Sequence, residues 1–166
     1  MAFEIYQTGK ASFQSSKKEA FDLHSKSSFG ELKEGKIAYS LYEVLYLLEK
    51  KQAKLLRESR EVRFSGLLKK ADTSLYIVFK DLRNKGNILK EGLKFGADFR
   101  VYDKGDKPGK SHAKYLLYIV DSKKIDTLAF AAKARIAHST NKILLIAIVD
   151  SESDVSYYEC RWKSKD

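Results

Sequence analysis

The sequence contains little of what a secreted or membrane-bound protein needs. It has one cysteine, Cys160, so no disulfide can form within the chain. One cysteine and three scattered histidines are also too few for a zinc site of the usual kind. The longest apolar run, ILLIAIV at residues 143–149, is far shorter than a membrane span of about 20 residues, and the N-terminus MAFEIYQTGK has no apolar run typical of a secretory signal. We therefore expect a soluble, cytoplasmic protein without a metal or other cofactor.

Acidic residues are outnumbered by basic ones. The 166 residues include 32 lysines and arginines but 22 aspartates and glutamates, which gives a net charge of +10. This imbalance predicts a polyanionic partner, with nucleic acid first. The ten tyrosines and nine phenylalanines would suit base stacking, although most of them are expected in the core. The alternative is a surface rich in lysine and glutamate, as in thermophilic proteins.

The pattern of apolar residues predicts two domains, at residues 1–70 and 71–166. In the first, FEIYQ and GKIAY have the composition of short strands. SLYEVLYLLEKKQ has a helical pattern that begins with a capping box formed by Ser40 and Glu43. A short helix is expected within residues 63–72, and the rest of this small mixed domain is expected to be irregular.

The second domain is expected to follow the order helix, three strands, helix, two strands. Asp72 or Thr73 should begin its first helix, and Gly86 should follow the end of that helix. The apolar strand KILLIAIVD should lie inside the sheet, buried on both faces. The predicted elements are a helix at 73–86, two strands within 87–103, a strand at 113–120, a helix at 124–140, and strands at 142–150 and 155–162. This order predicts an α/β sandwich around a mixed sheet.

Three side chains at the ends of these elements form a candidate catalytic set. Tyr102 ends one strand, His112 begins the next, and Lys142 begins the apolar strand. Cleavage of RNA without metal needs a base for the 2′-hydroxyl, an acid for the departing 5′-oxygen and a positive charge beside the phosphorane. Histidine suits either proton transfer, tyrosine can act as a base where a cationic neighbour stabilises its phenolate, and lysine supplies the charge.

Each of these residues also has an ordinary structural interpretation. A tyrosine or histidine at a strand end is usually structural, and Lys142 is one of 32 basic residues. His138 competes with His112, but it lies inside a helical pattern and is expected to be packed or to end the helix. A metal-dependent nuclease would use Asp98 as its first ligand and an E-x-K pattern on the next strand. That strand opens with HAK, which lacks the second carboxylate.

Three motifs in the second domain resemble the archaeal tRNA-splicing endonuclease (tRNA-intron endonuclease) family. They are K-D-L-R-x-x-G, then G-x-K-x-G-A-D-F-x-x-Y followed by a histidine ten residues later, and A-H-S-x-x-K. The segment SLYEVLYLLEKK is also similar to the end of the family's N-terminal domain. The expected fold class is α/β (α+β), with a small mixed N-terminal domain and a restriction-endonuclease-like α/β C-terminal domain around a central mixed sheet.

The resemblance implies an endoribonuclease that excises introns from precursor tRNA at bulge-helix-bulge sites. The products would be a 2′,3′-cyclic phosphate and a 5′-hydroxyl, formed without metal. Tyr102 would be the general base, His112 the general acid and Lys142 the group that stabilises the transition state. Arg135 matches the arginine that clamps a bulged base, with Arg161 near Trp162 as a competing choice.

The resemblance also implies assembly. The family works as four copies of this unit, in which an acidic hairpin tip inserts into a basic pocket of a neighbouring subunit and the last strands pair across a dimer interface. Asp150, Glu152 and Asp154 fit that tip. The sequence leaves open whether the chain forms a homotetramer or a heterotetramer with a structural subunit. Two other functions are alternatives: a non-catalytic RNA-binding subunit of the same assembly, which the complete set of three residues disfavours, and a metal-dependent DNA nuclease or junction resolvase.

Overall fold

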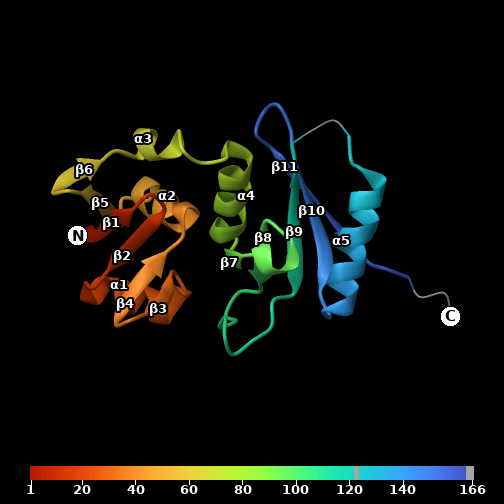
Figure 1. Ribbon diagram of the computed structural model, residues 1–166, viewed down its shortest axis with the longest axis horizontal. Coiled ribbons are helices and arrows are strands. Elements are labelled where there is room, and N and C mark those ends of the chain that lie inside the picture. The colour runs from red at the N-terminus through yellow and green to blue at the C-terminus, as the bar shows by residue number, and fades with distance from the viewer. Residues whose placement is uncertain (122–123, 164–166) are drawn as a thin grey trace. The chain divides into compact units, whose positions relative to one another are not determined.

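The structure, a computed structural model, describes residues 1–121 and 124–163 and divides the chain into two compact units (Figure 1). The N-terminal unit is Met1–Tyr76, and the C-terminal unit begins at Ile77. The domain boundary expected between residues 70 and 71 stays a prediction. Within the described ranges, no helix is long and apolar enough to cross a membrane.

The N-terminal unit is built on one mixed sheet. Its strand order is β3-β4-β2-β1-β5-β6, in which β1 and β5 run parallel and the other neighbours run antiparallel. Its elements in chain order are β1 (Phe3–Gly9), β2 (Ser12–Ser15), α1 (Lys18–Ser27), β3 (Glu31–Lys33), β4 (Lys36–Tyr39), α2 (Leu41–Glu49), β5 (Ala53–Arg57), β6 (Arg60–Val62) and α3 (Phe64–Leu68). The core forms where strand residues such as Ile5 and Leu55 meet Leu45 of α2.

The predicted capping box of α2 is confirmed. The backbone N–H of Glu43 donates to the Ser40 hydroxyl at 3.2 Å, and the Glu43 carboxylate accepts from the Ser40 N–H at 3.0 Å. The helix ends at Glu49, earlier than the predicted residue 52, because Lys51 takes a left-handed conformation with φ 55° and the chain turns into β5.

The expectation that the rest of this unit is irregular was wrong, because α1 and several short strands form there. The strands β2, β5 and β6 have three to five residues, and only alternate residues of β2 and β5 face the core. In α1 one residue, Ala20, is buried, and no side chain caps its N-terminus. Such short elements carry too few apolar residues for a periodic pattern.

The predicted order of the C-terminal elements is confirmed. The sheet has the order β11-β10-β9-β8-β7; β9 and β10 run parallel, and the other neighbours run antiparallel. The apolar strand β10 lies inside the sheet between β9 and β11, as predicted. The elements are α4 (Thr73–Asn84), β7 (Ile88–Glu91), the 3₁₀ helix η1 (Leu93–Phe95), β8 (Phe99–Tyr102), β9 (Tyr115–Val120), α5 (Thr127–Ser139), β10 (Ile143–Val149) and β11 (Val155–Cys160).

Two helices cover the two faces of this sheet (Figure 1). Ala137 of α5 packs with Leu116 and Leu144 on one face. On the other face, Phe79 of α4 meets Phe99 of β8, with ring centroids 5.7 Å apart. Because side chains alternate along a strand, Arg100 and Tyr102 of β8 point away from Phe99, toward the α5 face.

The predicted ends of α4 are confirmed. Of the two candidates for its start, Asp72 is the cap, since its carboxylate accepts the N–H of Leu75 at 3.0 Å. Gly86 follows the helix with φ 93°, a conformation that a residue with a Cβ rarely adopts.

Candidate active site

Tyr102 is held at the end of β8. Its side chain is 3% exposed and packs with Ile88, its partner on β7, and with Ala113. The phenolic oxygen accepts a hydrogen bond from Nη1 of Arg100 at 3.1 Å. The ring is therefore fixed by packing, and its oxygen is fixed by a guanidinium two residues earlier on the same face of the strand.

The sequence interpretation did not identify Arg100. Its Nε donates to the carbonyl oxygen of Glu91 at 2.8 Å, so the guanidinium has two anchors, one on β7 and one on Tyr102. The signal was present in the motif F-R-x-Y, because residues two apart on a strand share a face.

Lys142 stands immediately before β10. Its Nζ donates to the carbonyl oxygen of Thr140 at 3.0 Å and lies 4.9 Å from the centre of the Phe95 ring. The pKa of Lys142 is lowered, first because the ammonium loses solvent and then because Arg100 and Lys94 repel it. Lys142 and Arg100 therefore act on each other electrostatically, although 42 positions separate them in the sequence.

His112 lies in the loop before β9, which corrects the prediction that it opens the strand. The strand begins at Tyr115, and the side chain of His112 is exposed. The next residue, Ala113, is buried against Tyr102. In the described part of the chain, the His112 imidazole has no hydrogen-bond partner. His112 is therefore one residue from a contact of Tyr102 along the chain, and its own side chain is exposed.

Strand direction explains how the three predicted residues gather. Tyr102 ends β8, and β9 runs antiparallel to β8, so the segment that leads into β9 lies at the same edge of the sheet. Because β10 runs parallel to β9, Lys142 precedes its strand at that edge too. Two backbone hydrogen bonds link the segments: Lys114 N–H to Val101 O at 2.9 Å and Ile143 N–H to Lys114 O at 2.9 Å.

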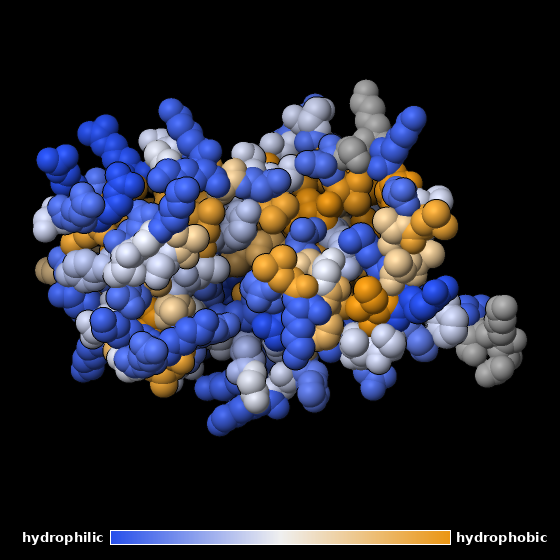
Figure 2. All heavy atoms as spheres, in the orientation of Figure 1, coloured by the Kyte–Doolittle hydropathy of each residue, from blue (hydrophilic) through white to orange (hydrophobic). Residues whose placement is uncertain are grey.

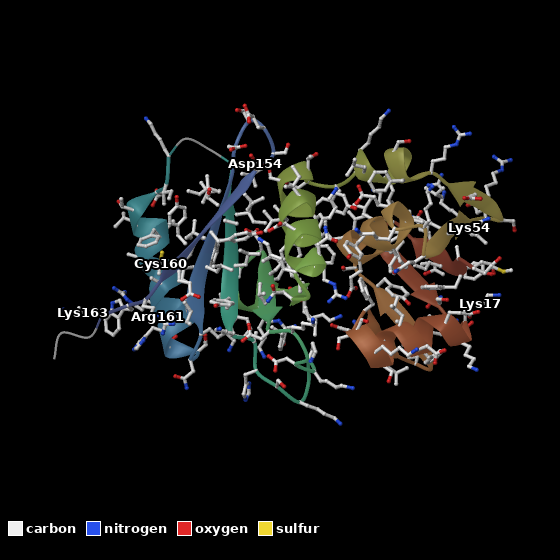
Figure 3. All side chains as sticks on the ribbon, turned by 180° about the vertical axis from the view of Figure 1, so that it is seen from behind. Lys17, Lys54, Asp154, Cys160, Arg161 and Lys163 are labelled. Carbon is white, nitrogen blue, oxygen red and sulfur yellow. The ribbon has the colours of Figure 1, made fainter. Side chains whose placement is uncertain are left out.

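A small pocket lies next to Lys142. Its volume is about 190 Å³, and its lining includes His138, Lys142, Arg161 and Trp162. The rings of His138 and Trp162 have centroids 4.6 Å apart. Figure 3 shows Arg161 where the chain leaves β11 beside α5. His138 is in the last turn of α5, as expected, but it is exposed on this pocket.

Two predicted RNA contacts, Arg135 and Arg161, have different surroundings. Arg161 lines the pocket next to Lys142 and also lies 3.4 Å from the Glu159 carboxylate, with both side chains exposed. Arg135 is exposed on α5 and is not among the residues that line the pocket. The geometry thus brings Arg161 and Trp162 close to Lys142, whereas Arg135 is placed only on the helix surface.

The predicted acidic tip is the turn between β10 and β11, where Figure 3 shows Asp154. Asp150 stabilises this turn, because its carboxylate accepts the N–H groups of Glu152 and Asp154, both at 2.9 Å. Glu152 and Asp154 are exposed. The three carboxylates are therefore not equivalent, since Asp150 also has a structural role.

Asp98, the residue considered as a metal ligand, accepts the backbone N–H of Ile119 at 2.8 Å. Across the described ranges, no group of three or more histidine, cysteine, aspartate or glutamate side chains is placed to hold a metal ion. The residues that surround Lys142 are instead cationic and aromatic.

Comparison with known proteins gives consistent results over both units. Residues 73–157 match the family model for the tRNA intron endonuclease, catalytic C-terminal domain, and residues 8–68 match that for the N-terminal domain. The tRNA-splicing endonuclease of Methanothermobacter thermautotrophicus is 41% identical, over 84% of this chain and 85% of that protein. The tRNA-splicing endonuclease of Pyrococcus furiosus is 38% identical, over 96% of this chain and 95% of its own. That of Nanoarchaeum equitans is 38% identical, over 74% of this chain and 87% of its own.

Proposed function

The chain belongs to the tRNA intron endonuclease family, and on this basis we propose that it is a catalytic subunit that excises introns from precursor tRNA. The proposed substrate is RNA with a bulge-helix-bulge motif at the splice sites. The proposed products are a 2′,3′-cyclic phosphate and a 5′-hydroxyl, and the chemistry needs no metal ion.

In the proposed reaction, Tyr102 in its phenolate form takes up the proton of the 2′-hydroxyl and becomes neutral, as the 2′-oxygen forms a bond with the adjacent phosphorus. The bond from phosphorus to the 5′-oxygen breaks, and His112 gives that oxygen a proton. Lys142 offsets the negative charge of the phosphorane. The observation that carries this proposal is the meeting of the three segments at one edge of the sheet, where Tyr102 accepts a hydrogen bond from a guanidinium and packs against Ala113, the residue that follows the exposed His112.

We further propose that Arg135, Arg161 and Trp162 bind the RNA next to the cleaved bond. An arginine or an indole can stack on an unpaired base. The position of Arg161 and Trp162 on the pocket of Lys142 supports them as base contacts. The net charge of +10 supports additional contacts with the phosphate backbone.

The proposed assembly is a homotetramer, or a heterotetramer with a structural subunit. Apolar side chains exposed over α5 support contacts between copies; Figure 2 shows them among hydrophilic neighbours. Leu128 is 82% exposed and Ile136 38%. Exposed apolar surface of this kind is common where proteins associate.

The test is to incubate the pure protein with bulge-helix-bulge RNA in the presence of EDTA. We expect cleavage at both splice sites, with cyclic phosphate and 5′-hydroxyl ends. Cleavage that appears only when a second subunit is added would favour the heterotetramer. Cleavage that requires Mg²⁺, or a Tyr102→Phe variant that cleaves at the wild-type rate, would contradict the proposed chemistry.

A further inference from the structure

Three cationic side chains surround the site without an acidic partner. Arg100 and Lys94 both repel Lys142, and Lys94 lies 5.8 Å from the centre of the Phe95 ring, whose face Lys142 also approaches. Among the described residues, none of the three forms an ion pair with a carboxylate. Cations brought together without compensation favour the binding of an anion between them.

Arg100 differs from the two lysines because its head group cannot rotate freely. The guanidinium is planar and carries five N–H donors in fixed directions. One bond goes to the Glu91 carbonyl and one to the Tyr102 oxygen, which leaves three N–H groups for another ligand. A planar group with two anchors presents those remaining donors in a defined direction, next to the phenolic oxygen.

The bond to Tyr102 has a directional consequence. Because Arg100 can only donate, Tyr102 is the acceptor, so the hydrogen of a neutral phenol would point away from Arg100. A guanidinium at this distance stabilises negative charge on the oxygen that accepts from it. Arg100 therefore holds the phenolic oxygen of Tyr102 in one place, with a positive charge beside it.

We propose that Arg100 is the positioning residue for Tyr102 and, together with Lys142, binds the non-bridging oxygens of the phosphate that is cleaved. The proposal rests on the proposed function for the identity of its substrate, but the anion site itself can be tested without cleavage. Lys94, on the neighbouring 3₁₀ helix, adds positive charge and is exposed.

The matched variants are Arg100→Gln, which removes the charge, and Arg100→Lys, which keeps the charge but lacks the planar group whose two nitrogens bind Glu91 and Tyr102. Arg60→Gln on β6 is the control, because that arginine is exposed in the N-terminal unit. Single-turnover cleavage at saturating RNA should fall about 100-fold in both Arg100 variants, since loss of one donor to a reacting oxyanion typically costs that much. Arg60→Gln should cleave at the wild-type rate.

A second measurement is independent of RNA cleavage. The protein is labelled with ¹³C at the lysine side chains, and the NMR signal of Lys142 is assigned by its loss in Lys142→Arg. This signal is then followed in two titrations, one with sulfate and one with increasing pH. The groups that face Lys142 are Lys94, Arg100 and, on the pocket side, His138, Cys160 and Arg161. Removal of the Arg100 charge should weaken the response of Lys142 to sulfate and raise its pKa toward the ordinary value of lysine. Arg100→Lys should keep that pKa low.

The outcomes separate the two proposals. If the wild-type protein does not cleave RNA, yet Lys142 responds to sulfate in an Arg100-dependent manner, the anion site stands and the proposed function fails. If Arg100→Gln cleaves like the wild type, or if Lys142 responds to sulfate equally with and without Arg100, the role of Arg100 is overturned. A wild-type cleavage rate in Arg100→Lys would also overturn the role of Arg100, because a positive charge at this position would then be sufficient for cleavage.

Discussion

The hydroxyl of Tyr157 on β11 donates a hydrogen bond of 2.6 Å to the carboxylate of Asp81 on α4. The same carboxylate lies 2.7 Å from the ammonium of Lys85, which in turn stands 4.7 Å from the centre of the Tyr157 ring. Asp81 belongs to the motif K-D-L-R-x-x-G, and its contacts here are structural. The contacts among these three side chains connect the edge strand β11 to the helix α4.

Tyr157→Phe should lower the free energy of unfolding by about 1–2 kcal/mol. Hydrogen bonds to charged groups typically contribute about 1.5–3 kcal/mol, and the estimate is at the lower end because Tyr157 and Asp81 are only half-buried. Urea unfolding measures the change. Tyr158→Phe is the control, since Tyr158 is itself 54% exposed and its substitution should cost no measurable stability. Equal stability of Tyr157→Phe and wild type would show that water replaces this bond at no cost.

The same pair predicts a dependence on alkaline pH. Burial, followed by the hydrogen bond to Asp81, raises the pKa of Tyr157 above its ordinary value of 10. The folded state therefore holds this proton more tightly than the unfolded state, so the stabilisation is complete below about pH 10 and is lost as pH rises beyond it. The difference in stability between wild type and Tyr157→Phe should shrink above that pH. A difference that stays constant would contradict the raised pKa.

His112→Ala should abolish most cleavage and leave RNA binding nearly unchanged. A general acid typically contributes about 10²–10⁴-fold in rate, and an exposed histidine is a small part of a large basic surface. Cleavage rates and filter binding on the same RNA measure the two effects. His138→Ala is the matched variant, because the His138 ring packs against that of Trp162 and its loss should affect binding more than the chemical step. The reverse result would transfer the role of general acid to His138.

Lys142→Ala should lower the single-turnover rate at saturating RNA more than it lowers affinity. A cation beside the phosphorane acts on the transition state rather than on the ground state. Because the pKa of Lys142 is lowered, the charge is lost, and the rate should fall, at a pH below the ordinary lysine value of 10.5. Lys142→Arg stays charged at that pH and should not show this fall. A loss of affinity alone would make Lys142 an ordinary phosphate contact.

The double variant Glu152→Gln and Asp154→Asn should break the proposed tetramer into dimers and reduce cleavage. Asp150 is kept because its carboxylate builds the turn, so its removal would confuse a folding defect with an assembly defect. Removing one partner of a buried, hydrogen-bonded charge pair typically costs about 2–5 kcal/mol of association free energy. A loss of that size is enough to change assembly at micromolar concentration. Sedimentation of the variant is the measurement. An intact, active tetramer would mean that the tip is only a solvated turn.

Local signals in the sequence determined the order of the C-terminal elements. The start of α4 at Asp72 or Thr73 and the glycine after it are short-range hydrogen-bonding and backbone preferences, of which the structure selects Asp72 as the cap. The capping box at Ser40 is a signal of the same kind in the N-terminal unit. The apolar run of β10 likewise indicated an interior strand. In the N-terminal unit the sequence predicted the strands β1 and β4 and the helix α3, but not α1, the other short strands or their pairing. Strands such as β1 and β5 pair across about 50 residues, which no local pattern records.

The sequence by itself also determined the three candidate catalytic residues, through their types and the motifs around them. Only the tertiary structure decided that Arg100 holds Tyr102 and repels Lys142, and that His112 lies in a loop instead of opening a strand. The physical reason is that hydrogen bonds and charge repulsion act over a few ångströms in space. Whether β8, η1 and the start of β10 come that close depends on strand order and register, which arise when the whole sheet packs between its two helices.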